Sequence, residues 1–217
     1  MKEQYEDDDM SYVDSCFNNH PVIGEKVIDR EFEYFQGNKF KKTTLSALYK
    51  DKWIVLFFYP ADFTFVCPTE LEDIADVYAK LKKMGVEVIS VSTDTVFTHK
   101  AWHDTSEAIK KVNFPMAADP TGQLARDFGV YIDKEGLALR GTFIINSQGV
   151  LKAMEVHDNS IGRNADELVR KVQAAQFVEI NKGQVCPARW LPIRSIRGCW
   201  ENTAELSLSM VVPINWA

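Results

Sequence analysis

The side chains with the clearest chemical potential in this chain are its four cysteines: Cys16, Cys67, Cys186 and Cys199. Two of them share the tripeptide Val-Cys-Pro, which occurs in "FVCPTE" and again in "QVCPAR". No two cysteines have the C-x-x-C spacing of a zinc site or a local redox pair. In a reducing compartment, four inert buried thiols are the simplest interpretation, so a chemical role needs support from the local sequence.

The sequence around Cys67 predicts a cysteine at the start of a helix. The apolar segment "KWIVLFFY" (52–59) is typical of a strand buried on both faces. After a short loop, residues 67–85 repeat apolar side chains at three- and four-residue steps, and Pro68 suits the first helical position. The free N–H groups and dipole at a helix N-terminus favour the thiolate, which is the nucleophile. The alternative is that Cys67 is only a small apolar cap.

The residues after Cys67 limit the kind of redox chemistry that it can perform. A thioredoxin-type disulfide exchanger needs a second cysteine three residues further on, and that position holds Glu70. A reactive thiolate without a local partner indicates attack on an external oxidant. The product would be a sulfenic acid, which a distant thiol then resolves.

The remaining patterns predict an α/β fold of the thioredoxin type, with a central mixed sheet flanked by helices. The element order is β-α-β-α, an insertion before the antiparallel half, and then β-β-α, preceded by an N-terminal hairpin. The expected elements are a hairpin in 30–45, a strand in 86–93, a helix in 97–112, an insertion with a short helix in 113–130, two strands in 140–156, and a helix in 164–180 with Asn164 as its N-cap.

One segment carries a resemblance to a known family. "FFYPADFTFVCPTEL" resembles the active-site segment of the peroxiredoxins, whose signature is Pro, three residues, Thr, two residues, Cys; Pro60, Thr64 and Cys67 keep this spacing. The similarity covers residues 21–190 and is closest to the typical two-cysteine branch, in particular to the peroxidatic subunits of bacterial alkyl hydroperoxide reductases. It implies a dithiol-dependent antioxidant peroxidase that reduces hydrogen peroxide and organic hydroperoxides, without a cofactor.

The resemblance also implies roles for individual residues. Cys67 would be the peroxidatic cysteine, Thr64 would hydrogen-bond the thiolate and the peroxide, and Pro60 would shield the pocket from water. Arg140, in "LRGTF", would stabilise the thiolate and align the peroxide, a task that suits a permanently charged, forked guanidinium. The family also has a supporting acid and a second arginine that orient the first arginine. Glu70 and Arg163 match these positions, although both also fit ordinary helix-end charges.

The segment "GQVCPARW" resembles the part of these proteins that carries the resolving cysteine, here Cys186. In the family this cysteine forms a disulfide with the peroxidatic cysteine of the other subunit. The resemblance therefore implies a homodimer, with assembly into a decamer, and a disulfide that thioredoxin or a flavoprotein disulfide reductase reduces. Cys16 and Cys199 match no family position.

Composition and charge bound the remaining possibilities. The chain has 217 residues and a net charge of −6, which argues against a nucleic-acid binder. We expect an acidic, disordered leader over 1–20, a peroxiredoxin domain over 21–180, and a C-terminal arm over 181–217 whose tail departs from the family at 191. No signal-peptide pattern or membrane-spanning apolar run is found, so a cytoplasmic location is expected.

The sequence leaves two alternatives to this interpretation. His99 and His103 stand four residues apart, as helical metal ligands can, but no third ligand is evident in the sequence. A chaperone-like ring that holds unfolded clients is the alternative function from another class. Replacing Cys67 by serine would separate the two, because only peroxidase turnover needs this thiol.

Overall fold

The computed structural model describes residues 20–192. The chain forms two compact units, residues 1–163 and residues 164–217. The first unit contains the sheet and Cys67, whereas the second contains the last long helix and Cys186. Cys16 and Cys199 lie outside the described residues, as do most of the predicted leader and tail. The predicted domain boundaries stay a prediction.

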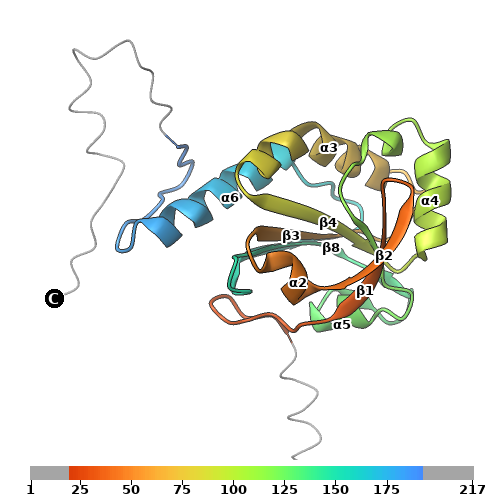
Figure 1. Ribbon diagram of the computed structural model, residues 1–217, viewed down its shortest axis with the longest axis horizontal. Helices are drawn as coiled ribbons and strands as arrows, with labels where there is room; N and C mark the ends of the chain where they lie inside the picture. Colours follow the sequence, from red (N-terminus) through yellow and green to blue (C-terminus); the bar gives the residue numbers. More distant parts are fainter. Residues whose placement is uncertain (1–19, 193–217) are drawn as a thin grey trace, which may run out of the picture. The chain divides into compact units, whose positions relative to one another are not determined.

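The first unit is built on a seven-stranded mixed sheet with the order β2-β1-β5-β4-β3-β8-β9 (Figure 1). Strands β3, β4 and β5 are parallel, and β8 and β9 run antiparallel beyond β3. A small separate hairpin pairs β6 with β7. The strands are β1 (Glu31–Gln36), β2 (Lys39–Thr44), β3 (Trp53–Phe58), β4 (Val86–Ser92), β5 (Met116–Ala118), β6 (Tyr131–Ile132), β7 (Leu137–Ala138), β8 (Arg140–Ile145) and β9 (Leu151–His157). The predicted α/β class, with its central mixed sheet, is confirmed.

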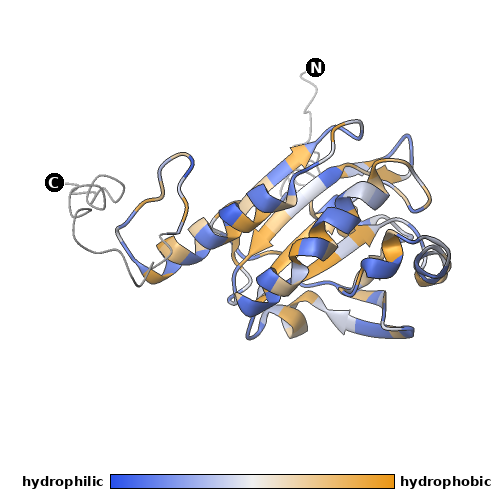
Figure 2. Cartoon of the chain, turned by 90° about the horizontal axis from the view of Figure 1, so that it is seen from above, coloured by the Kyte–Doolittle hydropathy of each residue, from blue (hydrophilic) through white to orange (hydrophobic). Residues whose placement is uncertain are grey.

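Helices cover both faces of this sheet. Figure 1 shows α3 and α4 over one face and α2 and α5 over the other. Figure 2 shows the apolar residues concentrated on the strands between them. The helices of this unit are α2 (Leu45–Tyr49), α3 (Cys67–Lys83), α4 (Val96–Thr105), the 3-10 turn η2 (Ile109–Lys111) and α5 (Gln123–Asp127). Because β3 is buried on both faces from Ile54 to Phe58, its continuous apolar sequence is explained.

The predicted passage from strand to helix at Cys67 is confirmed. Helix α3 begins at Cys67 and ends at Lys83, with proline in its first turn. Gly85 follows the helix with a φ of +72°, a conformation that glycine adopts without steric cost. The loop between β3 and α3 therefore places Cys67 at a helix N-terminus.

Two expectations about the following segments need correction. The single helix predicted over 97–112 is broken: α4 ends at Thr105, and only η2 follows it. The Thr105 hydroxyl donates to the Ala101 carbonyl, and Ser106 is extended, so side-chain hydrogen bonding competes with helix propagation here. The predicted insertion also contributes a strand to the sheet, because β5 pairs with β1 and β4. Three residues are too few to show a strand periodicity.

The second unit is described by itself. Helix α6 spans Ala165–Ile180, and Asn164 caps it by accepting a hydrogen bond from the Glu167 N–H, as predicted. The arm beyond α6 has no regular secondary structure up to residue 192. Over the described range, none of the helices has the length and apolar character that crossing a membrane would need.

The tight packing beside Arg140 generates a first prediction. An alanine methyl group at Gly141 would lie 2.8 Å from both the Phe143 ring and a Val130 methyl group, which is closer than carbon atoms approach. We expect Gly141→Ala to lower the free energy of unfolding by about 1–3 kcal/mol, measured by guanidinium denaturation. Gly162→Ala is the control, because its added methyl group would be 3.5 Å from Val66. Equal stability of the two variants would contradict the packing argument.

Candidate active site

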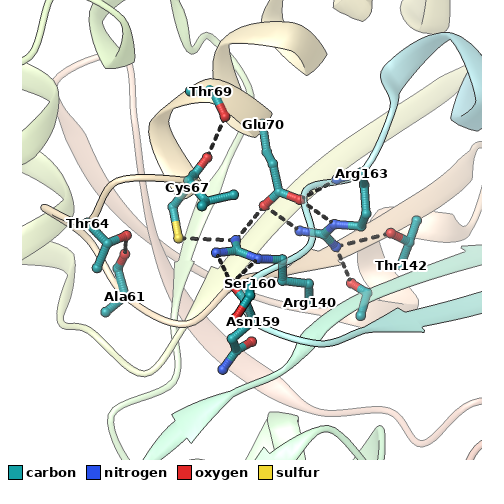
Figure 3. A network of polar contacts seen from close by, with 12 residues as sticks. Ala61, Thr64, Cys67, Thr69, Glu70, Arg140, Thr142, Asn159, Ser160 and Arg163 are labelled. Atoms are coloured by element: carbon teal, nitrogen blue, oxygen red, sulfur yellow. Dashed lines mark hydrogen bonds and ion pairs between the residues drawn. The ribbon is translucent and has the colours of Figure 1, made fainter.

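Cys67 lies at the first position of α3, and its side chain is fully buried, with 0% exposure. The Arg140 Nη1 group is 3.3 Å from the Cys67 sulfur (Figure 3). Two features therefore favour negative charge on this sulfur, the helix N-terminus and a guanidinium. Because the environment is buried, neither is weakened much by solvent. The alternative that Cys67 is only an apolar cap does not explain a charged donor directed at its sulfur.

Arg140 opens β8, and its guanidinium is held from three sides. Its Nε and Nη2 groups donate to the Asn159 carbonyl oxygen at 3.0 and 2.8 Å. Its Nη1 group donates to the Glu70 carboxylate at 2.6 Å as well as facing Cys67. A guanidinium can satisfy all these acceptors at once because its donors are fixed in one plane, which a lysine ammonium cannot reproduce.

Glu70 lies one helical turn after Cys67 and accepts hydrogen bonds from two arginines. Its Oε2 atom accepts from Arg140 Nη1 at 2.6 Å and from Arg163 Nη2 at 3.1 Å. Its Oε1 atom accepts from the Arg163 backbone N–H at 2.8 Å and from Arg163 Nε at 2.9 Å. All three side chains are at most 3% exposed. Glu70 therefore contacts Arg140 directly, and Arg163 is linked to Arg140 through Glu70. The supporting roles that the resemblance implied for Glu70 and Arg163 stay predictions.

Arg163 is fixed to the sheet as well as to Glu70. Its Nη1 group donates to the Gly141 carbonyl at 2.9 Å and to the Thr142 hydroxyl at 3.1 Å, and its guanidinium carbon lies 3.3 Å from the centre of the Phe57 ring. Burial lowers the pKa of Arg163, and the hydrogen bond to Glu70 opposes this change. The usual arginine pKa is so high that the group stays charged near neutral pH.

The charges of this cluster sum to a simple result. Two arginines and one glutamate leave one positive charge buried next to Cys67. A thiolate at Cys67 makes the cluster neutral, whereas a neutral thiol leaves the charge unbalanced. Burying charge without a counter-ion is costly, so a guanidinium held beside the Cys67 sulfur suits a nucleophilic sulfur at this position.

The structure places Thr64 and Pro60 near the start of α3 but does not show the contacts expected of them. Thr64 is exposed, and its hydroxyl donates to the Ala61 carbonyl at 2.9 Å rather than to Cys67 (Figure 3). A hydroxyl has one proton to donate, so bonding a thiolate would require the Thr64 side chain to rotate. Pro60 is buried directly after β3. The roles of both residues stay predictions.

Cys186 lies in the second unit, on the arm after α6, and is partly buried. Its sulfur is 3.8 Å from the Ala174 carbonyl oxygen. Burial raises the pKa of the Cys186 thiol, although the nearby positive charge of Arg170 opposes this effect. Cys186 therefore remains a thiol at higher pH than an ordinary cysteine, which suits a group that reacts second. Its predicted resolving role is not tested by this geometry.

Sequence reasoning missed the groups that hold the two arginines in place. The Asn159 carbonyl anchors Arg140, and the Phe57 ring and Thr142 hydroxyl anchor Arg163. A backbone carbonyl leaves no side-chain signal in a sequence. Phe57 and Thr142 are buried like their neighbours on the two strands, so only the register of β3 against β8, which pairs these two residues, reveals them.

The two histidines considered as metal ligands are otherwise engaged. Both ring nitrogens of buried His99 have hydrogen-bond partners, Asp62 and the Ala117 carbonyl. The His103 ring packs edge-on against Phe35. Over residues 20–192, no group of three or more His, Cys, Asp or Glu side chains is arranged to hold a metal ion.

A thioredoxin-like sheet that presents one buried cysteine at a helix N-terminus, against an arginine fixed by a glutamate and a second arginine, defines a thiol peroxidase of the peroxiredoxin class. The sequence model of the AhpC/TSA family matches residues 23–154. The chain belongs to this family.

Individual relatives agree with this assignment. The chain is 52% identical over 169 residues to alkyl hydroperoxide reductase C of Bacillus subtilis, which covers 78% of this chain and 90% of the relative. The crystal structure of Enterococcus faecalis AhpC is similar with a TM-score of 0.74 and 46% identity, over 77% of this chain and 99% of that one. A reduced 2-Cys peroxiredoxin from Plasmodium vivax gives a TM-score of 0.74 and 32% identity, over 78% and 90% of the two chains.

The contacts of Arg140 generate a second prediction. Arg140→Lys keeps the charge but loses the planar set of donors to Asn159, Glu70 and Cys67. We expect both Arg140→Lys and Arg140→Ala to slow peroxide reduction at least tenfold, or about 1.4 kcal/mol of barrier, and to slow alkylation of Cys67 by iodoacetamide. Arg126→Ala, at an exposed arginine, is the matched control and should leave both rates unchanged. Wild-type rates in Arg140→Lys would show that charge alone suffices.

Glu70 generates a third prediction, which concerns stability. Glu70→Gln preserves the shape but turns one of its acceptors into a donor and leaves two buried guanidinium groups uncompensated. We expect a loss of about 3–5 kcal/mol in the free energy of unfolding, measured by chemical denaturation. Glu72→Gln, two residues along α3, breaks only a partly exposed pair with Lys111 and should cost less than about 1 kcal/mol. Similar losses in both variants would refute the charge-balance argument.

Proposed function

We propose that this chain reduces hydrogen peroxide and small organic hydroperoxides through the thiolate of Cys67. The observation that carries this proposal is the position of the buried Cys67 sulfur, at a helix N-terminus and 3.3 Å from Arg140 Nη1. The same guanidinium that favours the thiolate can donate to a peroxide oxygen bound beside it. The names of the relatives, alkyl hydroperoxide reductase C and 2-Cys peroxiredoxin, support the same class of reaction.

The first step is a nucleophilic displacement at oxygen. The Cys67 thiolate attacks the terminal oxygen of the hydroperoxide, so a sulfur–oxygen bond forms as the oxygen–oxygen bond breaks. The sulfur is oxidised by two electrons to a sulfenic acid, and the leaving alkoxide or hydroxide takes up a proton to give alcohol or water. Arg140 would stabilise the negative charge as it moves from sulfur to the leaving oxygen.

The second step returns the sulfur to its thiol state. We propose that the thiol of Cys186 from the other subunit condenses with the sulfenic acid, forming a disulfide and releasing water. An external dithiol then reduces the disulfide. This dithiol belongs either to thioredoxin or to a flavoprotein disulfide reductase. The electrons reach Cys67 through thiols, so the steps on this chain use no metal, flavin or haem bound to it.

An intersubunit disulfide requires a homo-oligomer, and the sheet has a surface that suits one. Strand β9 is an edge strand, and Met154 and Val156 on it expose large apolar side chains. Such an edge presents unpaired backbone groups that a second copy can cover. We propose a homodimer as the minimum, with a decamer of five dimers as the larger assembly, located in the cytoplasm.

The chaperone alternative is not favoured. The relatives are named for a reductase and a peroxiredoxin, and the buried cluster around Cys67 is explained by thiolate chemistry. Holding unfolded clients would need neither the second arginine nor a glutamate buried between the two arginines.

A fourth prediction tests the proposed cysteine pair. After peroxide treatment, non-reducing electrophoresis should show a disulfide-linked dimer for the wild type and for the control variant Cys199→Ser. Cys67→Ser should lose both the dimer and peroxide consumption. Cys186→Ser should lose the dimer but still form a sulfenic acid, detected by dimedone labelling, because its first step is intact. A dimer that survives Cys186→Ser and disappears in Cys199→Ser would place the resolving thiol in the tail.

A further inference from the structure

A second buried polar cluster lies on the loop that precedes Cys67, and the proposed chemistry does not use it. Asp62 and His99 face each other with no exposure of either side chain, and His99 Nδ1 is 2.8 Å from Asp62 Oδ2. The Tyr59 hydroxyl donates to Asp62 Oδ1 at 2.7 Å. On the other side of the ring, His99 Nε2 lies 3.1 Å from the Ala117 carbonyl oxygen. The cluster thus joins the end of β3, the loop, α4 and β5.

This cluster fixes the loop to the rest of the fold. Asp62 also donates its backbone N–H to Asp94 Oδ2 at 2.8 Å. The next residue, Phe63, has a φ of +57°, a left-handed backbone conformation that is unfavourable for a residue other than glycine. Its ring lies against Trp102 of α4. Strain of this kind persists only where surrounding contacts impose it, so the Asp62 contacts hold the loop in a conformation that it would otherwise leave.

The partners of His99 determine how many protons the cluster must contain. The Ala117 carbonyl can only accept, so Nε2 must carry a hydrogen. Nδ1 faces a carboxylate oxygen, so one proton must lie between His99 and Asp62, on either atom. If this proton is removed, two lone pairs face each other in a fully buried site. Reversing the tautomer only moves the repulsion to the Ala117 carbonyl.

We infer that Asp62 and His99 are positioning residues that hold the Cys67 loop closed only while they share this proton, so that rising pH releases the loop. This inference rests on the proposed function, because opening of the loop matters only if Cys67 is resolved by a second thiol. The Cys67 sulfur is fully buried, and a disulfide needs its two sulfurs about 2.05 Å apart, so the loop must open before a resolving thiol can reach it. Release of the loop would therefore favour the reaction of oxidised Cys67 with the resolving thiol. The closed loop would favour the reaction of Cys67 with peroxide.

The charges around the pair agree with the direction of the effect. Burial raises the pKa of Asp62, and nearby Asp94 acts in the same direction, against the hydrogen bonds from His99 and Tyr59. Tyr59 is itself neutral, because burial and Asp62 raise its pKa well above the ordinary value. Among the groups that contact or act on the pair, only His99 can supply a positive charge.

The sign and range of the pH effect follow from proton counting. In the open loop, a solvated histidine loses its proton near about pH 6.5, and the carboxylate has already lost its own. The contacts of the closed loop retain this proton, so the closed loop holds one proton more than the open loop over any pH range in which the open loop has lost it and the closed loop has kept it. The opening equilibrium should therefore shift by up to about tenfold per pH unit over this range. Below about pH 6.5, both forms hold one proton and the dependence vanishes.

The experiment is hydrogen–deuterium exchange of the reduced, peroxide-free protein between about pH 5.5 and pH 9, which brackets this range. The peptide that covers residues 60–66 is followed, and its protection factors remove the intrinsic pH dependence of exchange. We expect protection to fall as pH rises above about 6.5. Asp62→Asn is the decisive variant, because an asparagine amide can donate to neutral His99 Nδ1 while its oxygen accepts from Tyr59. This variant should keep the loop protected and lose the alkaline decrease.

Two further variants complete the test. His99→Asn removes the ring and should leave residues 60–66 weakly protected at every pH. His103→Asn, one turn further along α4, is the matched control and should behave like the wild type. Flat protection in the wild type, or an unchanged alkaline decrease in Asp62→Asn, would overturn the inference. Because exchange is measured without peroxide, a protein that shows the pH effect but consumes no peroxide would refute only the proposed function.

Discussion

The requirement that buried charge be balanced governs the arrangement of the candidate active site. Arg140 and Arg163 bring two positive charges into a region with almost no solvent, and Glu70 neutralises one of them. The Cys67 sulfur faces Arg140 and is therefore placed to balance positive charge when it is ionised. The candidate nucleophile is therefore held by the same buried network that fixes the two arginines and Glu70.

This constraint explains why the site uses elements that are far apart in the sequence. Glu70 must be one turn from Cys67 on α3, and Arg140 must begin β8, which lies next to β3 in the sheet. Arg163 then approaches Glu70 from the end of the same unit and is supported by the ring of Phe57. A polar cluster of this kind tolerates little displacement, because each donor that loses its acceptor becomes an unsatisfied buried group.

The sequence predicted what is encoded locally and missed what depends on register. The apolar run of β3, the start of α3 at Cys67, the Asn164 cap and the mixed sheet were all predictable from spacing and residue type. The break after Thr105 was not, because the helical residue pattern continues past Ser106, whose backbone is extended. The carbonyl anchor at Asn159 has no sequence signature, and the contact of Thr64 with Ala61 depends on a loop conformation that propensity does not specify.

The loop before Cys67 lies between two buried clusters that respond differently to pH. At its end, Arg140 and Arg163 keep their charge at any physiological pH, so the surroundings of the sulfur are constant. In its middle, the contact between Asp62 and His99 requires one shared proton, so this contact holds the loop only while the proton is present. A peroxidase that resolves its oxidised cysteine with a distant thiol needs both properties, because the same residue must be enclosed during attack and accessible during resolution. Permanent charges can keep the surroundings of the enclosed sulfur constant. A titratable pair such as Asp62 and His99 can make the opening of the loop respond to pH.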